Sequence, residues 1–253
     1  MSKMNILKKM AIVAVLFVGG ATAQAQMENT VSFDVTLPTG DFNDNVDLTT
    51  MVDHLLTTDN FSPMSRKYIG KDATIGIGGT YRFSYFFDVG FGEVAPYAEA
   101  SLLWNQIRKT ERNLYDENLQ AKKPTYFNIP ILLGVTYRYR LTEIISLFGE
   151  FGLGYDAFIA TSEGWRDESN HPFFTYSCKG AMAWQVGVGS YFGKYVSASI
   201  HYYGLGNHII EYANSDIQNN PNNYPAYYRD PEVLTSTVKR SVGSLMLRIG
   251  FHF

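Results

Sequence analysis

The sequence has 253 residues, 21 basic and 24 acidic side chains, and one cysteine, Cys178. A net charge of −3 argues against a nucleic-acid surface, and a single cysteine excludes an internal disulfide and a cysteine metal cluster. Aromatic side chains make up 15% of the chain, with 18 Tyr and 17 Phe, which favours strands.

Residues 1–25 have the three parts of a secretory signal peptide. Three lysines give a positive start, the apolar run MAIVAVLFVGG follows, and small residues come last. The run is too short for a membrane-spanning helix. We therefore expect cleavage after Ala25, which leaves residues 26–253 as one exported domain. Removing three of the 21 basic residues leaves 18 against 24 acidic ones.

Eight later segments alternate between apolar and small or polar residues. Their approximate ranges are 29–37, 72–86, 94–108, 125–140, 144–160, 179–193, 195–208 and 240–253. A period of two indicates strands with two unlike faces. A soluble sandwich would bury the apolar register, whereas a lipid-spanning barrel would turn it outward and place the polar register in the lumen.

Connection lengths and aromatic positions distinguish these two architectures. Short connections follow the second, fourth and sixth segments, and long ones follow the others, as in outer-membrane barrels. Tyr137, Phe192 and Phe251 fall at the short-turn end, and Trp104 and Trp184 at the long-loop end, as in aromatic belts at two membrane interfaces. The sequence therefore predicts an all-β fold: an eight-stranded antiparallel up-and-down transmembrane β-barrel with long extracellular loops.

The first long connection also has a helical pattern. Val46, Leu48, Met51, Val52 and Leu55 recur at helical spacing. We expect one short loop helix there, folded over the mouth of the barrel.

Several motifs, in their order along the chain, resemble a known family. They are LPTGDF (37–42), FNIPILLGVTYRY (127–139), WQVGVGSYFG (184–193), YYGLGN (202–207) and the closing LMLRIGFHF. The chain is similar to Bacteroidota-type outer-membrane β-barrel domain proteins, the PorT-like relatives of the OmpA and OmpX barrels. This resemblance covers nearly the whole exported chain. It implies a barrel in the Gram-negative outer membrane and brings no shared catalytic residues or cofactor.

Charged residues of the inward register are the first candidate site. They are Asp34, Arg82, Glu99, Arg138, Glu150, Asp156 and Arg248. Such charges could line a conduction path, but side chains fill the lumen of an eight-stranded barrel, and buried charges need partners. We therefore predict a plug of interlocked ion pairs.

Hydrolysis is the second candidate, since some barrels of this size are lipid A deacylases that use Ser and His. Ser199 and His201 lie two residues apart, but the alternation turns both inward. His208 and Glu211 fall near the loop rim without a serine at matching spacing. The acidic residues of the last loop also lack calcium-loop spacing. We expect no enzymatic activity, no metal and no cofactor.

The sequence thus favours a structural or surface-interaction role carried by the extracellular loops. The stretch 214–232, rich in Asn, Pro and Tyr, suits a recognition loop. Expected partners are outer-membrane lipid, a surface or envelope protein or glycan, and the outer-membrane assembly machinery. The C-terminal signal for that machinery would comprise Leu247, Ile249, Phe251 and Phe253. The alternatives are a narrow porin or a transport- or secretion-associated barrel, and then a lipid-modifying enzyme.

Overall fold

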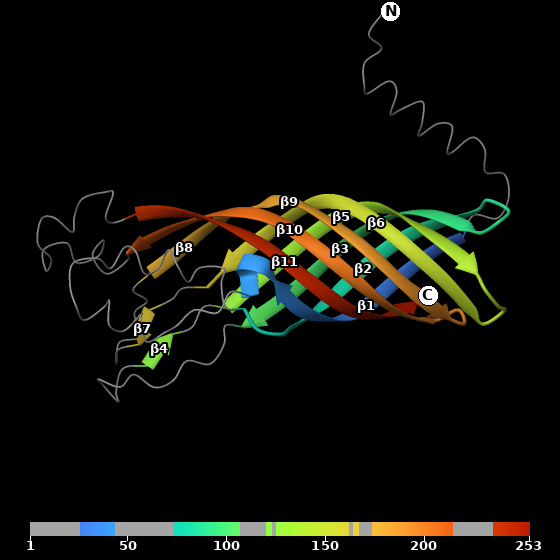
Figure 1. Ribbon diagram of the computed structural model, residues 1–253, viewed down its shortest axis with the longest axis horizontal. Coiled ribbons are helices and arrows are strands. Elements are labelled where there is room, and N and C mark those ends of the chain that lie inside the picture. Colours follow the sequence, from blue (N-terminus) through green and yellow to red (C-terminus); the bar gives the residue numbers. More distant parts are fainter. Residues whose placement is uncertain are drawn as a thin grey trace, which may run out of the picture.

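A closed barrel of antiparallel strands is the main feature of the computed structural model (Figure 1). The structure describes residues 26–43, 73–106, 120–122, 125–161, 164–166, 174–214 and 235–253. Within these ranges, no helix has the length and apolar character needed to span a membrane.

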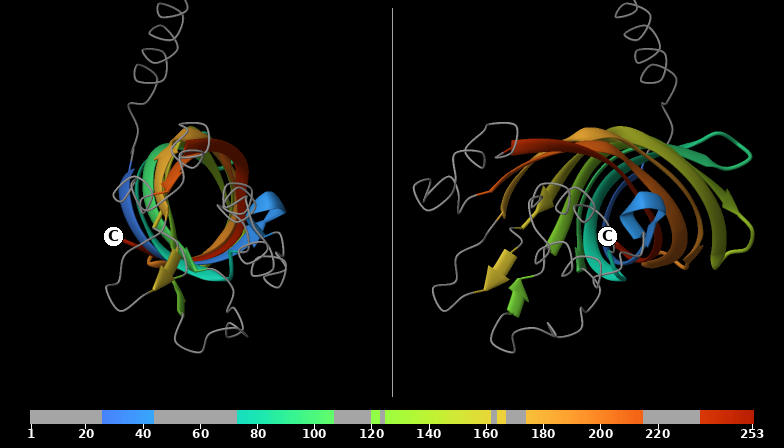
Figure 2. Two further views of the ribbon diagram at one scale, coloured as in Figure 1. Left: turned by 90° about the vertical axis from the view of Figure 1, so that its left-hand side faces the viewer. Right: turned by 60° about the vertical axis from the view of Figure 1, so that its left-hand side comes forward.

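Eight strands form the barrel wall. They are β1 (Gln26–Thr39), β2 (Gly76–Asp88), β3 (Glu93–Gln106), β5 (Thr125–Arg140), β6 (Ile145–Ala160), β9 (Ala181–Phe192), β10 (Val196–Asn214) and β11 (Thr235–His252). Each pairs with the next along the chain, and β11 returns to pair with β1, so the sheet closes. The view along the barrel shows the ring (Figure 2). The predicted eight-stranded antiparallel barrel is confirmed.

Register at the seam follows the alternation in both strands. Val31 lies opposite Phe251 and Phe33 opposite Ile249, so apolar residues meet on the outer face. Asp34 lies opposite Arg248 on the inner face. Because one-residue slips would exchange the two faces, the two-sided pattern selects this register.

The short connections all lie at one end of the barrel. They are residues 89–92, 141–144 and 193–195, between β2 and β3, β5 and β6, and β9 and β10. The first is closed by a hydrogen bond from the Val89 amide to the Gly92 carbonyl (2.9 Å). The start of β1 and the end of β11 lie at this same end, since Asn29 and Phe253 exchange two backbone hydrogen bonds of 3.0 Å.

The outer and inner faces of the wall differ as the alternation predicts. Outward apolar side chains remain largely exposed, for example Leu133 (68%), Val188 (62%) and Ile131 (61%). Inward polar side chains are buried, including Glu99 (3%) and Asp34 (0%). The apolar face therefore lies outside, and the chain does not bury it against a second sheet.

The long-loop end of the barrel departs from the expected segments. β10 and β11 run past the predicted ends at 208 and 240, to Asn214 and from Thr235. The wall strand before β10 is split at Gly180 into β8 (Phe174–Lys179) and β9, and both parts pair with β10. A separate ribbon joins β4 (Gln120–Lys122) to β7 (Gly164–Arg166). None of these features has a clear signal in the alternation.

A register shift between Gly204 and Gly206 lets β10 continue past the split. Gly206 has a φ of +87°, and a Cβ there would lie 2.4 Å from the Met182 carbonyl oxygen. Glycine therefore meets both the backbone and the space requirement at this bulge.

Some sequence predictions lie outside the described residues. They include the signal peptide with cleavage after Ala25, the loop helix in 46–55 and most of the loop 214–232. The structure does describe a short 3-10 turn, η1 (Gly40–Asn43), directly after β1.

Candidate functional site: the interior of the barrel

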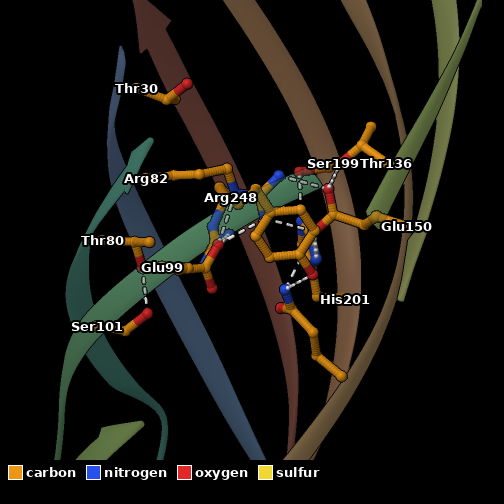
Figure 3. A network of polar contacts seen from close by, with 12 residues as sticks. Thr30, Thr80, Arg82, Glu99, Ser101, Thr136, Glu150, Ser199, His201 and Arg248 are labelled. Carbon is orange, nitrogen blue, oxygen red and sulfur yellow. Dashed lines mark hydrogen bonds and ion pairs between the residues drawn. The ribbon is translucent and has the colours of Figure 1, made fainter. Parts of the chain in front are cut away.

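Five charged residues from five strands form one network at the centre of the lumen, and Figure 3 shows four of them, Arg82, Glu99, Glu150 and Arg248. They are Asp34, Arg82, Glu99, Glu150 and Arg248. Two of the contacts follow directly from strand register, because Arg82 lies opposite Glu99 and Asp34 opposite Arg248. Strand pairing thus places these opposite charges side by side.

Arg82 holds two carboxylates. Its Nε donates to Glu99 Oε2 at 2.8 Å, and its Nη1 donates to Glu150 Oε2 at 2.5 Å. Arg248 holds two as well, with Nε 2.7 Å from Asp34 Oδ1 and Nη1 2.9 Å from Glu99 Oε2. Glu99 therefore lies between two guanidinium groups, and the five side chains make a continuous chain of alternating charge.

Hydroxyl groups occupy the remaining hydrogen-bonding positions of the network. Tyr203 donates its phenol hydrogen to Glu99, and Arg248 Nη2 donates to the Tyr203 oxygen at 2.9 Å. The Thr80 hydroxyl lies 2.5 Å from Asp34 Oδ2 and 2.7 Å from Ser101 Oγ. These groups satisfy carboxylate oxygens that would otherwise be desolvated without a partner.

Tyr97 crosses the lumen beside this network. The Arg82 guanidinium carbon lies 4.2 Å from the centroid of its ring, and Gln185 Nε2 donates to its hydroxyl oxygen at 2.6 Å. A Cβ at Gly134 would lie 2.3 Å from Tyr97 Cζ, so only glycine leaves room for the ring there. The Tyr97 ring on β3 therefore occupies the space that Gly134 leaves free on the neighbouring strand β5.

Arg138 belongs to a second cluster at the short-turn end and does not contact the central carboxylates. It donates to Glu93 at 2.6 Å and to Glu28 at 3.1 Å. Its guanidinium carbon lies 3.8 Å from the Phe86 ring centroid. His252 Nδ1 lies 3.0 Å from Glu28, which links the closing strand to this cluster.

Asp156 lies in a third cluster, near the long-loop end, with His208. His208 Nε2 lies 2.8 Å from the Leu205 carbonyl oxygen, and Nδ1 lies 3.1 Å from the Lys179 carbonyl oxygen. The same Nε2 lies 3.1 Å from Asp156 Oδ2. His208 is fully buried beside this carboxylate. The sequence analysis placed it near the loop rim, and β10 continues six residues beyond it, to Asn214.

Three guanidinium groups and three imidazoles face six carboxylates within the described part of the lumen. Each imidazole lies against one carboxylate: His201 against Glu150, His208 against Asp156 and His252 against Glu28. The carboxylates are Glu28, Asp34, Glu93, Glu99, Glu150 and Asp156, and the guanidinium groups belong to Arg82, Arg138 and Arg248. Each of these carboxylates thus has an arginine or histidine side chain beside it.

An apolar cap fills the lumen on the long-loop side of the charges, and the sequence analysis missed it. Phe42, from η1, is fully buried, with its ring centroid 5.5 Å from that of Tyr126 and 6.2 Å from that of Phe158. The rest of the cap is Ala73, Leu103, Leu132, Ala160, Ala183, Tyr203, Leu205, Val242 and Met246. Leu103, Leu132 and Met246 are large apolar residues in the inward register, and this was the available signal.

Ser199, His201 and Glu150 have the order of a nucleophile, base and carboxylate. Ser199 Oγ lies 2.7 Å from His201 Nε2. His201 Nδ1 is 3.2 Å from Glu150 Oε1, within ion-pair distance but without hydrogen-bond geometry. Within the described residues, no group of three or more His, Cys, Asp and Glu side chains is arranged to hold a metal ion.

The closing strand presents its apolar register on the outside. Leu247, Ile249, Phe251 and Phe253 are 45%, 51%, 53% and 70% exposed. The backbones of Leu247, Ile249 and Phe251 pair with β1 on one side and β10 on the other. The backbone of Phe253 exchanges hydrogen bonds with Asn29 of β1. The strand therefore completes the ring and leaves these four side chains on the outer surface.

No protein-family model matches the sequence, and a search of curated proteins finds no significant relative. Several solved structures are similar. Ail, the attachment invasion locus protein of Yersinia pestis, solved with the heparin analogue sucrose octasulfate, is 10% identical with a TM-score of 0.40, over 91% of this chain and 100% of that chain. The outer-membrane protein OprG of Pseudomonas aeruginosa is 12% identical with a TM-score of 0.48, over 92% and 98%.

The outer-membrane enzyme PagL is 13% identical with a TM-score of 0.39, over 87% of this chain and 97% of that chain. These proteins have different roles. With every one of these TM-scores below 0.5, the likeness assigns none of those roles to the present chain.

Proposed function

We propose that this protein is an integral outer-membrane barrel whose sealed lumen supports a structural or surface-interaction role. The observation that carries the proposal is the contrast between the two faces of the wall. An exposed apolar exterior surrounds an interior in which buried carboxylates lie beside arginine and histidine side chains. A water-soluble protein would leave that exterior unburied, and apolar patches of this extent drive association. Lipid removes the penalty, and a closed sheet has no unpaired edge within the apolar layer.

The finer assignment, a PorT-like barrel of the Bacteroidota type, is part of this proposal. It rests on the order of the motifs along the chain. Two of those motifs contain a residue whose structural role in the barrel can be identified. LPTGDF places Phe42 in the apolar cap, and YYGLGN contains the bulge at Gly206.

A sealed lumen is favoured over a narrow porin by what fills it. The central network joins five strands across the interior, and Phe42 fills the long-loop side between Tyr126 and Phe158. Opening a path for ions would require breaking buried ion pairs, each at a cost of about 3–5 kcal/mol.

We propose that Ser199 acts in packing and hydrogen bonding and does not act as a nucleophile. An acyl-transfer site needs donors aimed at the developing oxyanion. Ser199 lies within β10, which pairs with both neighbours there, so the strand ladders use the surrounding backbone N–H groups. At 8% exposure, Ser199 also offers little access to a substrate. A fluorophosphonate probe should therefore fail to label the folded protein.

The loops are the proposed location of any partner interaction. The connections between η1 and β2 and between β10 and β11 are far longer than neighbouring strands require. The proposed partners are a surface or envelope protein or glycan. The outer-membrane assembly machinery would recognise the closing strand through Leu247, Ile249, Phe251 and Phe253. Replacing residues 215–234 with a short Gly/Ser turn should leave the barrel folded and remove a loop-bound partner from pull-downs.

Membrane insertion is tested by fractionation and by gel mobility. The protein should be recovered from the outer-membrane fraction, and unboiled protein should migrate differently from boiled protein. Recovery from the soluble periplasmic fraction, with the same mobility before and after boiling, would refute the proposal.

A further inference from the structure

A buried amide interrupts the apolar cap. Asn128 on β5 is fully buried, and the residues directly opposite it are Leu103 on β3 and Phe158 on β6, both members of the cap. Neither of these two neighbours has a polar side-chain atom. Within the described residues, Asn128 Oδ1 and Nδ2 both lack a hydrogen-bond partner. A dry amide in these surroundings would be costly, because its donors and its acceptor have lost water without compensation.

The Asp156 carboxylate on the neighbouring strand β6 also lacks a well-formed hydrogen bond. It is fully buried, and the residues directly opposite it, Pro130 and Ala181, offer no side-chain donor. His208 Nε2 approaches Oδ2 to 3.1 Å, but its hydrogen-bond geometry favours the Leu205 carbonyl oxygen, 2.8 Å away. Neither carboxylate oxygen therefore has a hydrogen-bond partner in the described part of the chain.

Strand register makes these two polar side chains neighbours. Asn128 lies opposite Phe158 and Asp156 lies opposite Pro130, so the two side chains are diagonal neighbours on the inner face. The Cβ atoms of such neighbours are about 7 Å apart. That separation is long for a direct hydrogen bond between two short side chains, and it suits two hydrogen bonds in series through one water. Gly154, two residues before Asp156 on the same face, leaves space beside the carboxylate.

The unpaired atoms determine which kind of group can bind between them. Asn128 presents two donor hydrogens and an acceptor, whereas an ionised Asp156 presents acceptors alone. A metal cation would leave the amide hydrogens unpaired, and the carboxylate would repel an anion. A water molecule both donates and accepts, and buried water pairs with polar groups that otherwise have no partner. Water therefore fits both side chains.

We propose that ordered water lies between Asn128 and Asp156 and bridges the two side chains. One water accepts a hydrogen bond from Asn128 Nδ2 and donates one to the Asp156 carboxylate, and another donates to Asn128 Oδ1. The inference does not depend on membrane insertion, because it concerns the interior of the closed barrel. The water is held within the apolar cap, so it satisfies the polar atoms without opening a path for ions.

A crystal structure of the full barrel, at a resolution that shows ordered water, tests the proposal directly. Density for a water should lie at about 2.7–3.2 Å from both Asn128 Nδ2 and an Asp156 carboxylate oxygen. Asn105 is the matched control, a buried asparagine whose Nδ2 donates to Thr36 Oγ1 and to the Thr74 carbonyl oxygen, both at 2.9 Å. No water should lie within hydrogen-bond distance of Asn105 Nδ2, because protein atoms use both of its hydrogens.

Urea unfolding of Asn128→Leu and Asn105→Leu gives a second readout. If water pairs the Asn128 amide, Asn128→Leu should lower the unfolding midpoint, because Asp156 loses its hydrogen-bonded bridge. A dry amide would give the opposite sign, since leucine would then remove unpaired buried polar atoms. Asn105→Leu should lower the midpoint in either case, because the Thr74 carbonyl oxygen loses its side-chain donor.

Three results would overturn the proposal. They are a raised midpoint for Asn128→Leu, no water density between Asn128 and Asp156, and a direct hydrogen bond between these two side chains. The crystal structure of the wild type decides the question if the Asn128→Leu chain does not fold.

Discussion

Replacing Arg248 with methionine tests how strongly the central network holds the barrel together. Arg248 is 5% exposed and joins Asp34, through Nε at 2.7 Å, to Glu99, through Nη1 at 2.9 Å. Methionine keeps much of the volume and removes the charge. Asp34 would keep the Thr80 hydroxyl as a partner but would lose its cation.

The expected loss in the free energy of unfolding is about 3–5 kcal/mol, the usual result of removing one partner from a buried ion pair. Adding Asp34→Asn to Arg248→Met removes the uncompensated carboxylate. The double variant should therefore be more stable than the sum of the two single changes predicts, by about 1–3 kcal/mol. This coupling separates loss of the ion pair from loss of packing.

Urea unfolding in lipid vesicles, followed by tryptophan fluorescence, gives these energies. Arg140→Met is the matched control, because Arg140 is an exposed arginine beside a short turn, and it should leave stability near the wild-type value. The network would not be a stabilising element if the free energy of unfolding of Arg248→Met were within about 1 kcal/mol of the wild-type value. The same conclusion would follow if the effects of Arg248→Met and Asp34→Asn were simply additive.

Three further changes test other parts of the barrel. Phe42→Ala should cost about 3–5 kcal/mol by opening a cavity in the apolar cap, whereas Phe91→Ala at an exposed turn should change little; equal effects would contradict the buried position of Phe42. Leu247→Arg should cost about 2–4 kcal/mol in vesicles if it lies at the membrane midplane, and a neutral effect would refute that depth. His208→Phe should destabilise the barrel by about 1–3 kcal/mol by leaving the buried Asp156 carboxyl without its imidazole partner, with partial recovery on adding Asp156→Asn. No recovery would show that the His208–Asp156 contact is not the cause.

Alternation predicted the strands and their two faces because each residue's face depends only on its position within one strand. Leu133 is exposed and Glu99 is buried, as the pattern requires. The order of the strands around the barrel also followed from the sequence, since short connections can join only adjacent antiparallel strands. These parts of the fold are local and therefore readable without a structure.

Partners across the lumen could not be predicted in the same way. Asp34 and Arg248 are separated by nearly the whole chain and meet because the seam closes in one register. Arg138 and Asp156 share the inward register with them but lie at different depths, so they join other clusters. Depth depends on the stagger of all strands, which a single segment does not contain.

Phe42 was missed for a related reason. It follows β1 in a short 3-10 turn, so its direction does not follow strand alternation, and only the fold shows that it enters the lumen. His208 was misplaced because the strand before β10 is split and β10 itself is bulged and longer than predicted. In both cases the error lies where regular strand geometry ends.

Single-channel recording in planar lipid bilayers tests the sealed lumen most directly. The account predicts that the inserted wild-type protein shows little or no steady conductance, because ion pairs and the Phe42 cap together fill the interior. Insertion of the same preparation is verified by its heat-dependent gel mobility. A large, stable open channel in the wild type would contradict the account and make Arg82, Glu99 and Glu150 lining residues of a pore.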